Sequence, residues 1–118
     1  MNPPASPEPR VRVVEGLGLG AAITVVVAYG EHDHASREVL EGALAPLRGN
    51  VIVDLSWCSF IDSSVVAVLL AKHADLEADG RWIELVVPHT NVDLSRTIER
   101  LGVAHLVRVR EDSSQLRS

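Results

Sequence analysis

The sequence has little cysteine and no long apolar run. Cys58 is the single cysteine in 118 residues, so no internal disulfide can form, and no group of Cys and His has the spacing of a zinc site. No apolar stretch approaches the roughly 20 residues of a membrane span, and the amino terminus lacks the layout of a signal peptide. We therefore expect a soluble, cytoplasmic protein that does not associate with membranes.

Basic and aromatic residues are also scarce. There are 16 Asp and Glu against 11 Lys and Arg, which gives a formal net charge of -5 and repels phosphate backbones. Only one Phe and one Tyr are present for base stacking. The composition therefore disfavours nucleic acid as a partner.

The length and the local composition predict one domain with a short leader. A chain of 118 residues buries about two-thirds of its unfolded surface and needs neither a disulfide nor a metal for stability. Residues 1–9 carry four prolines and little that can pack, so they are expected to be a disordered leader. The folded domain is expected over residues 10–118.

Apolar blocks and amphipathic stretches alternate along this domain. Their periods predict strands at 11–14, 22–28, 51–55, 82–87 and 106–109, and helices at 36–47, 63–79 and 90–101, with 111–118 forming a last helical turn or fraying. Gly16, Gly18 and Gly20 indicate a hairpin turn, because a dinucleotide-binding loop would need a helix after the glycines. The order predicts an α/β fold in which about four helices pack against a mixed sheet of about five strands.

Two segments mark helix starts and contain polar side chains. Gly30–Ser36 is a polar segment expected to form a loop in which Ser36 caps the following helix. His32 and His34 are metal-ligand types, but they alternate on this loop without further ligands nearby, so no metal site is predicted. Thr90 or Asn91 is expected to cap the helix at 90–101.

The segment Asp62-Ser63-Ser64, between the strand at 51–55 and the helix at 63–79, is the most informative one. The first backbone N–H groups of a helix lack partners inside it, and a side-chain oxygen can accept from one of them. Only one of the two adjacent serines can cap, which leaves the other hydroxyl spare at the positive end of the helix dipole. A spare hydroxyl at that position is a natural place for a phosphate.

The same helix predicts a partner surface and a structural histidine. At 100 degrees per residue, Val68 falls on the polar side with Lys72 and Asp75, and an exposed valine near the serines hints at a contact with a partner. His73 falls on the apolar side and is expected to be partly buried with a structural role.

Three segments together carry a resemblance to a known family. They are Gly30–His34 before a short helix, Asp54–Ser56 followed by Phe60–Ser64, and Ile98–Val103. In this order, over about residues 10–110, they resemble the STAS domain, and more narrowly the bacterial anti-sigma-factor antagonists. The resemblance implies a STAS-type α/β fold and a role in regulating sigma-factor-dependent transcription.

The resemblance also implies residues and partners. Ser63 would be phosphorylated by a partner that is both serine kinase and anti-sigma factor, and only the unphosphorylated form would bind that partner and free the sigma factor. A PP2C-type phosphatase would restore binding. The loop carrying Glu31 and Asp33 resembles the family's contact loop. Together with Val68 from the helical period, the full set of expected contact residues is Glu31, Asp33, Asp62, Ser63, Ser64, Val65 and Val68.

Val65 departs from the family pattern, which has glycine at this position. A β-branched residue there is expected to place two methyl groups on the partner surface. Either the partner has a matching pocket, or this member binds differently, or the site is no longer a kinase substrate. The alternative function is an unphosphorylated STAS scaffold or accessory subunit of a larger regulatory or transport complex.

An enzymatic alternative makes Ser63 a nucleophile with His32, His34 or His73 as its base, because a hydroxyl nucleophile needs an adjacent base. The Gly-x-Ser-x-Gly elbow is absent from the sequence, and no oxyanion-hole signature is visible. We therefore expect neither an enzyme nor a cofactor.

Overall fold

A five-stranded mixed sheet forms the centre of the fold. The computed structural model describes residues 8–15 and 23–111. The strands are β1 (Arg10–Glu15), β2 (Ile23–His32), β3 (Asn50–Ile61), β4 (Ile83–Val86) and β5 (Arg108–Arg110), in the spatial order β1-β2-β3-β4-β5. β1 pairs antiparallel with β2, and every later pair is parallel. The hairpin turn predicted over 16–20 and most of the leader lie outside the described residues.

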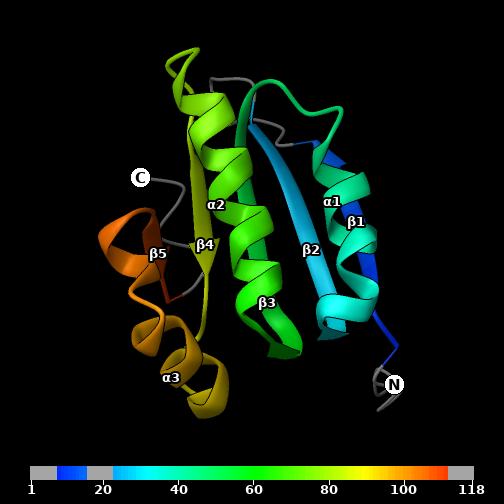
Figure 1. Cartoon of the computed structure of the whole chain (residues 1–118), viewed down its shortest axis with the longest axis vertical. Helices are drawn as coiled ribbons and strands as arrows, with labels where there is room; N and C mark the ends of the chain where they lie inside the picture. Colours follow the sequence, from blue (N-terminus) through cyan, green and yellow to red (C-terminus); the bar gives the residue numbers. More distant parts are fainter. Residues whose placement is uncertain (1–7, 16–22, 112–118) are drawn as a thin grey trace.

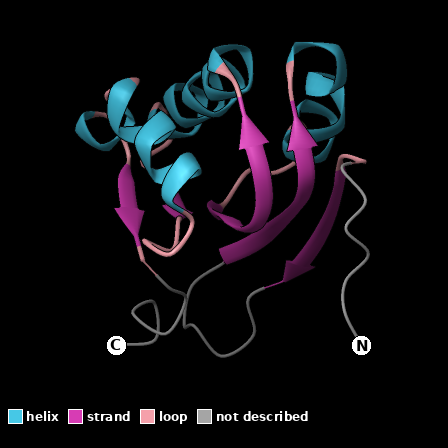
Figure 2. Cartoon of the chain, turned by 90° about the horizontal axis from the view of Figure 1, so that it is seen from below, coloured by secondary structure: helices cyan, strands magenta, loops and turns pink. Residues whose placement is uncertain are grey.

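The helices cover one face of this sheet, as Figures 1 and 2 show from two directions. They are α1 (Arg37–Leu44), α2 (Ser63–Glu77) and α3 (Val92–Arg100), with short 3-10 turns η1 (His34–Ser36) and η2 (Val103–His105). The predicted α/β fold is confirmed, but the described residues contain three α-helices rather than four. The fourth was expected over 111–118, of which only Glu111 is described.

The core lies between the sheet and the helices. Alternate residues of the central strands point toward the helices, because successive side chains of a strand face opposite sides. Val26, Val53 and Leu85 from the strands and Leu40 and Leu69 from the helices are completely buried there. The opposite face of the sheet has no helix over it in the described part of the chain (Figure 2).

β2 and β3 extend well beyond the strands predicted at 22–28 and 51–55. The two strands pair with each other along the added residues, as far as His32 with Ile61, through two shifts of register. Glycine, serine and acidic residues are poor strand formers, so the local pattern predicted a loop there. Pairing between distant segments overrides that preference, and the prediction of a loop beginning at Gly30 is wrong.

The first helix starts differently from the prediction. Asp33 caps the turn η1: its Oδ1 accepts from the Ser36 N–H at 3.0 Å and from the Ser36 hydroxyl at 2.9 Å. Ser36 makes no side-chain cap for α1, which ends at Leu44 rather than near residue 47. Asn91 does cap α3, accepting from the Leu94 N–H at 3.3 Å.

Candidate functional site

The carboxylate of Asp62 joins two segments of the chain at the start of α2. Its Oδ1 accepts hydrogen bonds from the N–H of Ser64 at 3.0 Å, from the N–H of Val65 at 3.1 Å and from the Ser64 hydroxyl at 2.6 Å. Its Oδ2 accepts from the N–H of His34 at 2.9 Å. Asp62 is therefore both the N-cap of α2 and a tie to the segment that follows β2.

These contacts keep Asp62 charged. Partial burial acts to raise the pKa of Asp62, but the hydrogen bonds from the Ser64 hydroxyl and from the N–H groups of Val65, His34 and Ser64 lower it overall. A carboxylate at the amino end of a helix is also favoured by the helix dipole. The start of α2 thus carries a fixed negative charge at neutral pH.

The two serines after Asp62 have different environments. The hydroxyl of Ser64 donates to Asp62, whereas Ser63 is exposed and its hydroxyl has no hydrogen-bond partner among the described residues. The sequence predicted that one of the serines caps the helix, but the N-cap of α2 is Asp62. Ser63 carries the spare hydroxyl.

The structure brings the predicted contact segment to the serines. Glu31 is exposed near the end of β2, and Asp33 is half-buried and occupied by its hydrogen bonds to Ser36. His34 follows, and its N–H reaches Asp62. Sequence reasoning missed this hydrogen bond, because a backbone donor 28 residues away leaves no local signal.

Val65 does not lie on the surface. Its side chain is completely buried in the core cluster beneath α2. The expectation that its methyl groups face a partner is therefore wrong: this position of the helix points toward the sheet. Any effect of replacing the family's glycine by Val65 acts through packing.

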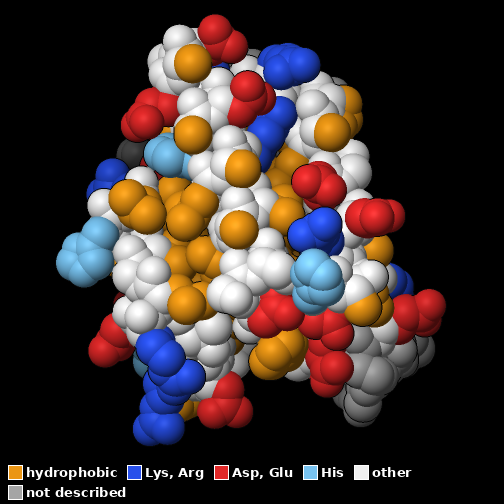
Figure 3. All heavy atoms as spheres, viewed as in Figure 1, with side chains coloured by type: hydrophobic (Ala, Val, Ile, Leu, Met, Phe, Trp, Pro, Cys, Tyr) orange, Lys and Arg blue, Asp and Glu red, His pale blue; other side chains and the backbone are white. Residues whose placement is uncertain are grey.

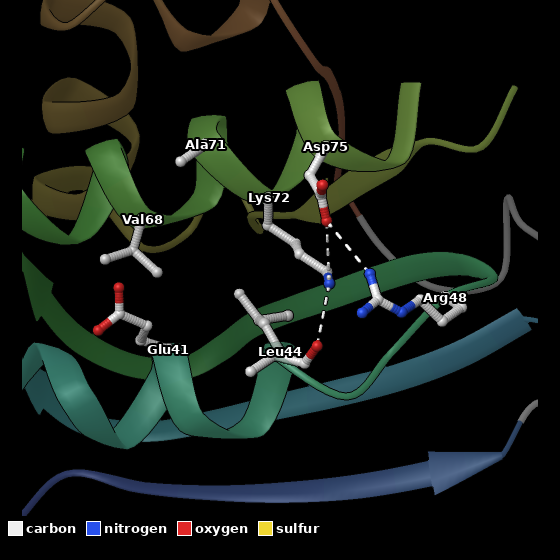
Figure 4. Close-up of a pocket in the computed structure, with 8 residues that line it drawn as sticks. Glu41, Leu44, Arg48, Val68, Ala71, Lys72 and Asp75 are labelled. Carbon is white, nitrogen blue, oxygen red and sulfur yellow. Dashed lines mark hydrogen bonds and ion pairs between the residues drawn. The ribbon is translucent and has the colours of Figure 1, made fainter. Parts of the chain in front are cut away.

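Val68 lines a groove between α1 and α2 with a volume of about 370 Å³ (Figure 4). Val68 is half-buried rather than exposed, and Lys72 is only 9% exposed although the helical period placed it on the polar side. The Lys72 Nζ donates to the carbonyl of Ala45 at 3.3 Å and lies 3.6 Å from the Asp75 carboxylate, which also meets Arg48 at 3.6 Å. Lys72 of α2 thus binds the carboxyl end of α1.

His73 and His32 hydrogen-bond to backbone groups rather than to Ser63. The ring of His73 is 15% exposed, and its Nδ1 accepts from the Ile83 N–H at 3.1 Å, so the predicted structural role is confirmed. His32 is completely buried in β2, not on a loop, and its Nε2 lies 3.0 Å from the Tyr29 carbonyl. None of the described imidazoles hydrogen-bonds to the Ser63 hydroxyl.

Burial also shifts the titration of His32. It lowers the pKa of the imidazole, against opposing contributions from the backbone of Tyr29 and Arg10 and from the Asp33 charge. Its Nδ1 is buried and has no hydrogen-bond partner among the residues that the structure describes. The neutral ring is therefore the form that this fold accommodates.

The sequence reasoning did not single out two exposed aromatic side chains of β3. Trp57 is 56% exposed and Phe60 is 45% exposed, both in the part of β3 that was predicted to be a connection. Their exposure depends on the register of β3 and leaves no signal in the sequence.

Residues 17–108 match the family model described as "Mlab, STAS domain". The chain belongs to the STAS domain family. No curated protein sequence matches it. The suspected family is thus confirmed over most of the domain.

Solved structures share the fold at low identity. An anti-sigma factor antagonist from Mycobacterium paratuberculosis is 21% identical, with 95% of this chain and 93% of that chain covered and a TM-score of 0.74. SpoIIAA in its unphosphorylated form is 19% identical over 89% of this chain and 91% of that one, with a TM-score of 0.68. The murine anion transporter Slc26a9 is 16% identical over 92% of this chain and 22% of its own, with a TM-score of 0.65.

Two further observations concern membranes and metals. Within the described residues, every helix is too short or too polar to cross a membrane. Across residues 8–15 and 23–111, no three His, Cys, Asp or Glu side chains gather as metal ligands do.

Proposed function

We propose that this STAS domain is an anti-sigma-factor antagonist that is switched off by phosphorylation of Ser63. In the unphosphorylated form it binds a serine kinase that also acts as the anti-sigma factor, and a PP2C-type phosphatase reverses the modification. The similarity in fold to antagonists such as SpoIIAA supports this proposal.

The observation that carries the proposal is the difference between the two serines. Ser63 offers an exposed hydroxyl without a partner in the described part of the chain, while the Ser64 hydroxyl is held by Asp62 at 2.6 Å. A kinase needs a hydroxyl that can enter its active site, and Ser63 meets this requirement. The contact surface proposed around it comprises Glu31, Asp33, Asp62, Ser64 and the edge of Val68.

The switch follows from charge at the start of α2. A phosphoserine carries about -1.5 to -2 charges. The N–H groups of Ser64 and Val65 already donate to the Asp62 side chain, and that of Val66 donates to the Asp62 carbonyl. A phosphate on Ser63 therefore competes with the Asp62 carboxylate for the N–H groups of Ser64 and Val65 and repels that carboxylate.

This repulsion acts on the tie between Asp62 and His34, and so on the contact segment after β2. The added charge also repels an acidic or phosphate-bearing site on the partner. A loss of 2 to 3 kcal/mol in binding free energy lowers affinity about 30- to 150-fold, which is enough for a switch. The core is untouched, so the fold survives the modification.

The test is phosphorylation by candidate anti-sigma kinases with ATP, followed by mass-spectrometric mapping. We expect phosphate on Ser63 in wild type and in Ser64→Ala, and none in Ser63→Ala. Ser63→Asp should bind the same kinase at least about 30-fold more weakly than Ser63→Ala. Phosphate that maps to Ser64 instead, or equal binding by Ser63→Asp and Ser63→Ala, would refute the proposal.

A second candidate function is an accessory STAS subunit of a transport complex. It is favoured by the similarity in fold to the Slc26a9 anion transporter. Under this function Ser63 is not modified, and Ser63→Asp binds its partner as tightly as wild type. Pull-down of each variant with size measurement of the complex separates the two functions.

A further inference from the structure

We propose that Asn91 is a positioning residue for Ser63, because its side chain holds β3 at a bulge that begins at Cys58, five residues before the proposed phosphoacceptor. This inference rests on the proposed function for the role of Ser63. It assigns to the connection between β4 and α3, which is distant from Ser63 in the sequence, a part in presenting the Ser63 hydroxyl to the kinase.

The ladder that holds β3 is interrupted close to the end of the strand. Two consecutive residues of β2 pair with Cys58 and Phe60, so Ser59 is left without a register partner. On its other edge, β3 pairs with β4 only as far as Asp54. An extra residue of this kind bends a strand and disrupts its ladder locally. The direction in which β3 enters the turn at Ser63 therefore depends on what holds the backbone at this bulge.

The side chain of Asn91 holds the backbone at the bulge. Its Nδ2 donates to the carbonyl of Cys58 at 2.8 Å, while its Oδ1 accepts from the N–H of Leu94 at 3.3 Å as the cap of α3. The backbone N–H of Asn91 donates to the carbonyl of Pro88 at 3.0 Å, and its carbonyl accepts from the N–H of Ser95 at 2.9 Å. An amide fits this place because it carries a donor and an acceptor on one short side chain. The bulge is thus fastened to the start of α3.

The segment between the bulge and Ser63 is short and well fixed. The thiol of Cys58 donates to the carbonyl of Phe60 at 3.3 Å across the bulge, and the side chain of Ile61 is buried in the core. Asp62 is fixed by its hydrogen bonds at the start of α2. The hydroxyl of Ser63 has no hydrogen-bond partner among the described residues, so the backbone places it. A shift of the backbone at Cys58 is therefore passed on to Ser63.

Small shifts matter for the proposed modification. Figure 1 shows the starts of α2 and α3 at the same end of the molecule, where β3 also ends. Phosphoryl transfer needs the attacking oxygen in line with the leaving group, and a displacement of about 1 Å can lower the rate about 100-fold. A change at the bulge can therefore slow the chemical step while the contacts that bind the kinase remain.

Two variants separate the hold on β3 from the cap of α3. Asn91→Asp keeps an acceptor for the N–H of Leu94 but loses the donor to the Cys58 carbonyl. Asn91→Ser keeps a favourable cap, but its side chain is one bond shorter and does not reach that carbonyl. Acidic side chains already gather at this end of the molecule (Figure 3), so the uncharged Asn91→Ser controls for the charge that Asn91→Asp adds. Thr90→Ala, at the exposed neighbouring position, is the matched control.

NMR of the ¹⁵N-labelled protein tests the coupling without a kinase. We expect both variants to change the amide shifts of residues 59–64 and to speed amide hydrogen exchange at Ser64 and Val65 about 5-fold, the factor that corresponds to one hydrogen bond. Thr90→Ala should leave residues 59–64 unchanged. Changes confined to residues 88–95 would make Asn91 a cap alone, and changes in Asn91→Asp but not in Asn91→Ser would be an effect of charge. Either outcome overturns the inference.

A second experiment separates this inference from the proposed function. With a kinase that phosphorylates Ser63, at a temperature where every variant is folded, Asn91→Asp and Asn91→Ser should lower kcat at least about 5-fold with KM unchanged, whereas Thr90→Ala should change neither. Equal kcat values for wild type and both Asn91 variants, or a rise in KM alone, refute the positioning role while the proposed function stands. Absence of any phosphorylation refutes the proposed function, and the NMR comparison then decides by itself whether Asn91 positions Ser63.

Discussion

Replacing Asp62 by alanine tests the geometry at the start of α2. The substitution removes four hydrogen bonds at once: from the N–H groups of Ser64, Val65 and His34, and from the Ser64 hydroxyl. Loss of an N-cap of this kind costs about 1 kcal/mol, and loss of the bond to the exposed His34 N–H adds about 0.5 to 1 kcal/mol. We expect Asp62→Ala to lower the free energy of unfolding by about 2 kcal/mol.

Asp62→Asn separates the two contributions. An asparagine still accepts at the amino end of α2, but its amide group cannot accept from the His34 N–H, so about 1 kcal/mol should be lost. The pH dependence has a definite sign. The pKa of Asp62 is lowered in the folded state, so its contribution is complete above the ordinary value of 3.8 and is lost as the pH falls through the lowered pKa.

Urea unfolding followed by circular dichroism measures these differences, and a loss of 2 kcal/mol corresponds to a fall of about 8 °C in Tm for a domain of this size. Asp79→Ala is the matched control, because it removes an exposed carboxylate just beyond the other end of α2 and should cause no loss. If Asp62→Ala loses no more than Asp79→Ala, the cap does not stabilise α2 as the geometry requires.

Three other substitutions or probes address buried residues near the site. As the pH falls from 7 to 5, the wild type should lose stability, because the unfolded chain protonates His32 near 6.5 while burial lowers the pKa of His32 in the folded state. His32→Leu should lose less stability over this range, whereas His34→Leu should follow wild type. Equal urea midpoints for all three proteins across this range would contradict the burial of His32. Burial raises the pKa of Cys58 to about 11, so its thiol should stay unreactive toward a disulfide reagent at pH 8 until urea unfolds the domain. Rapid labelling of Cys58 in the native protein would contradict this and show that β3 opens locally. Val65→Gly should cost about 3 kcal/mol in unfolding free energy from lost burial and helix propensity, against about 1 kcal/mol for the exposed Ala67→Gly, and equal losses would argue against a buried Val65.

The local signals in the sequence predicted much of the fold. The change from an apolar block to a helical period across Asp62 and Ser63 located α2, because cap preferences act within a few residues. The order of strands and helices predicted the mixed sheet for the same reason: each period reflects one buried face of one element. The family segments then pointed to the STAS domain, which the family model confirms.

Contacts between distant segments decided the rest. β3 continues to Ile61 because β2 supplies its hydrogen-bond partners, although the local composition favours a connection. Lys72 is buried because the carboxyl end of α1 lies against it, and a helical period cannot indicate which neighbour covers a polar face.

By itself, the sequence determined that a helix begins within Asp62-Ser63-Ser64 and that one of the two serines has a hydroxyl to spare, since capping is a local interaction. Only the tertiary structure decided that the spare hydroxyl belongs to Ser63, that Asp62 holds the His34 N–H, and that Val65 faces the core. It also left the side chains of Trp57 and Phe60 exposed in β3. These facts depend on register and on helix packing, which are set by residues far apart in the chain.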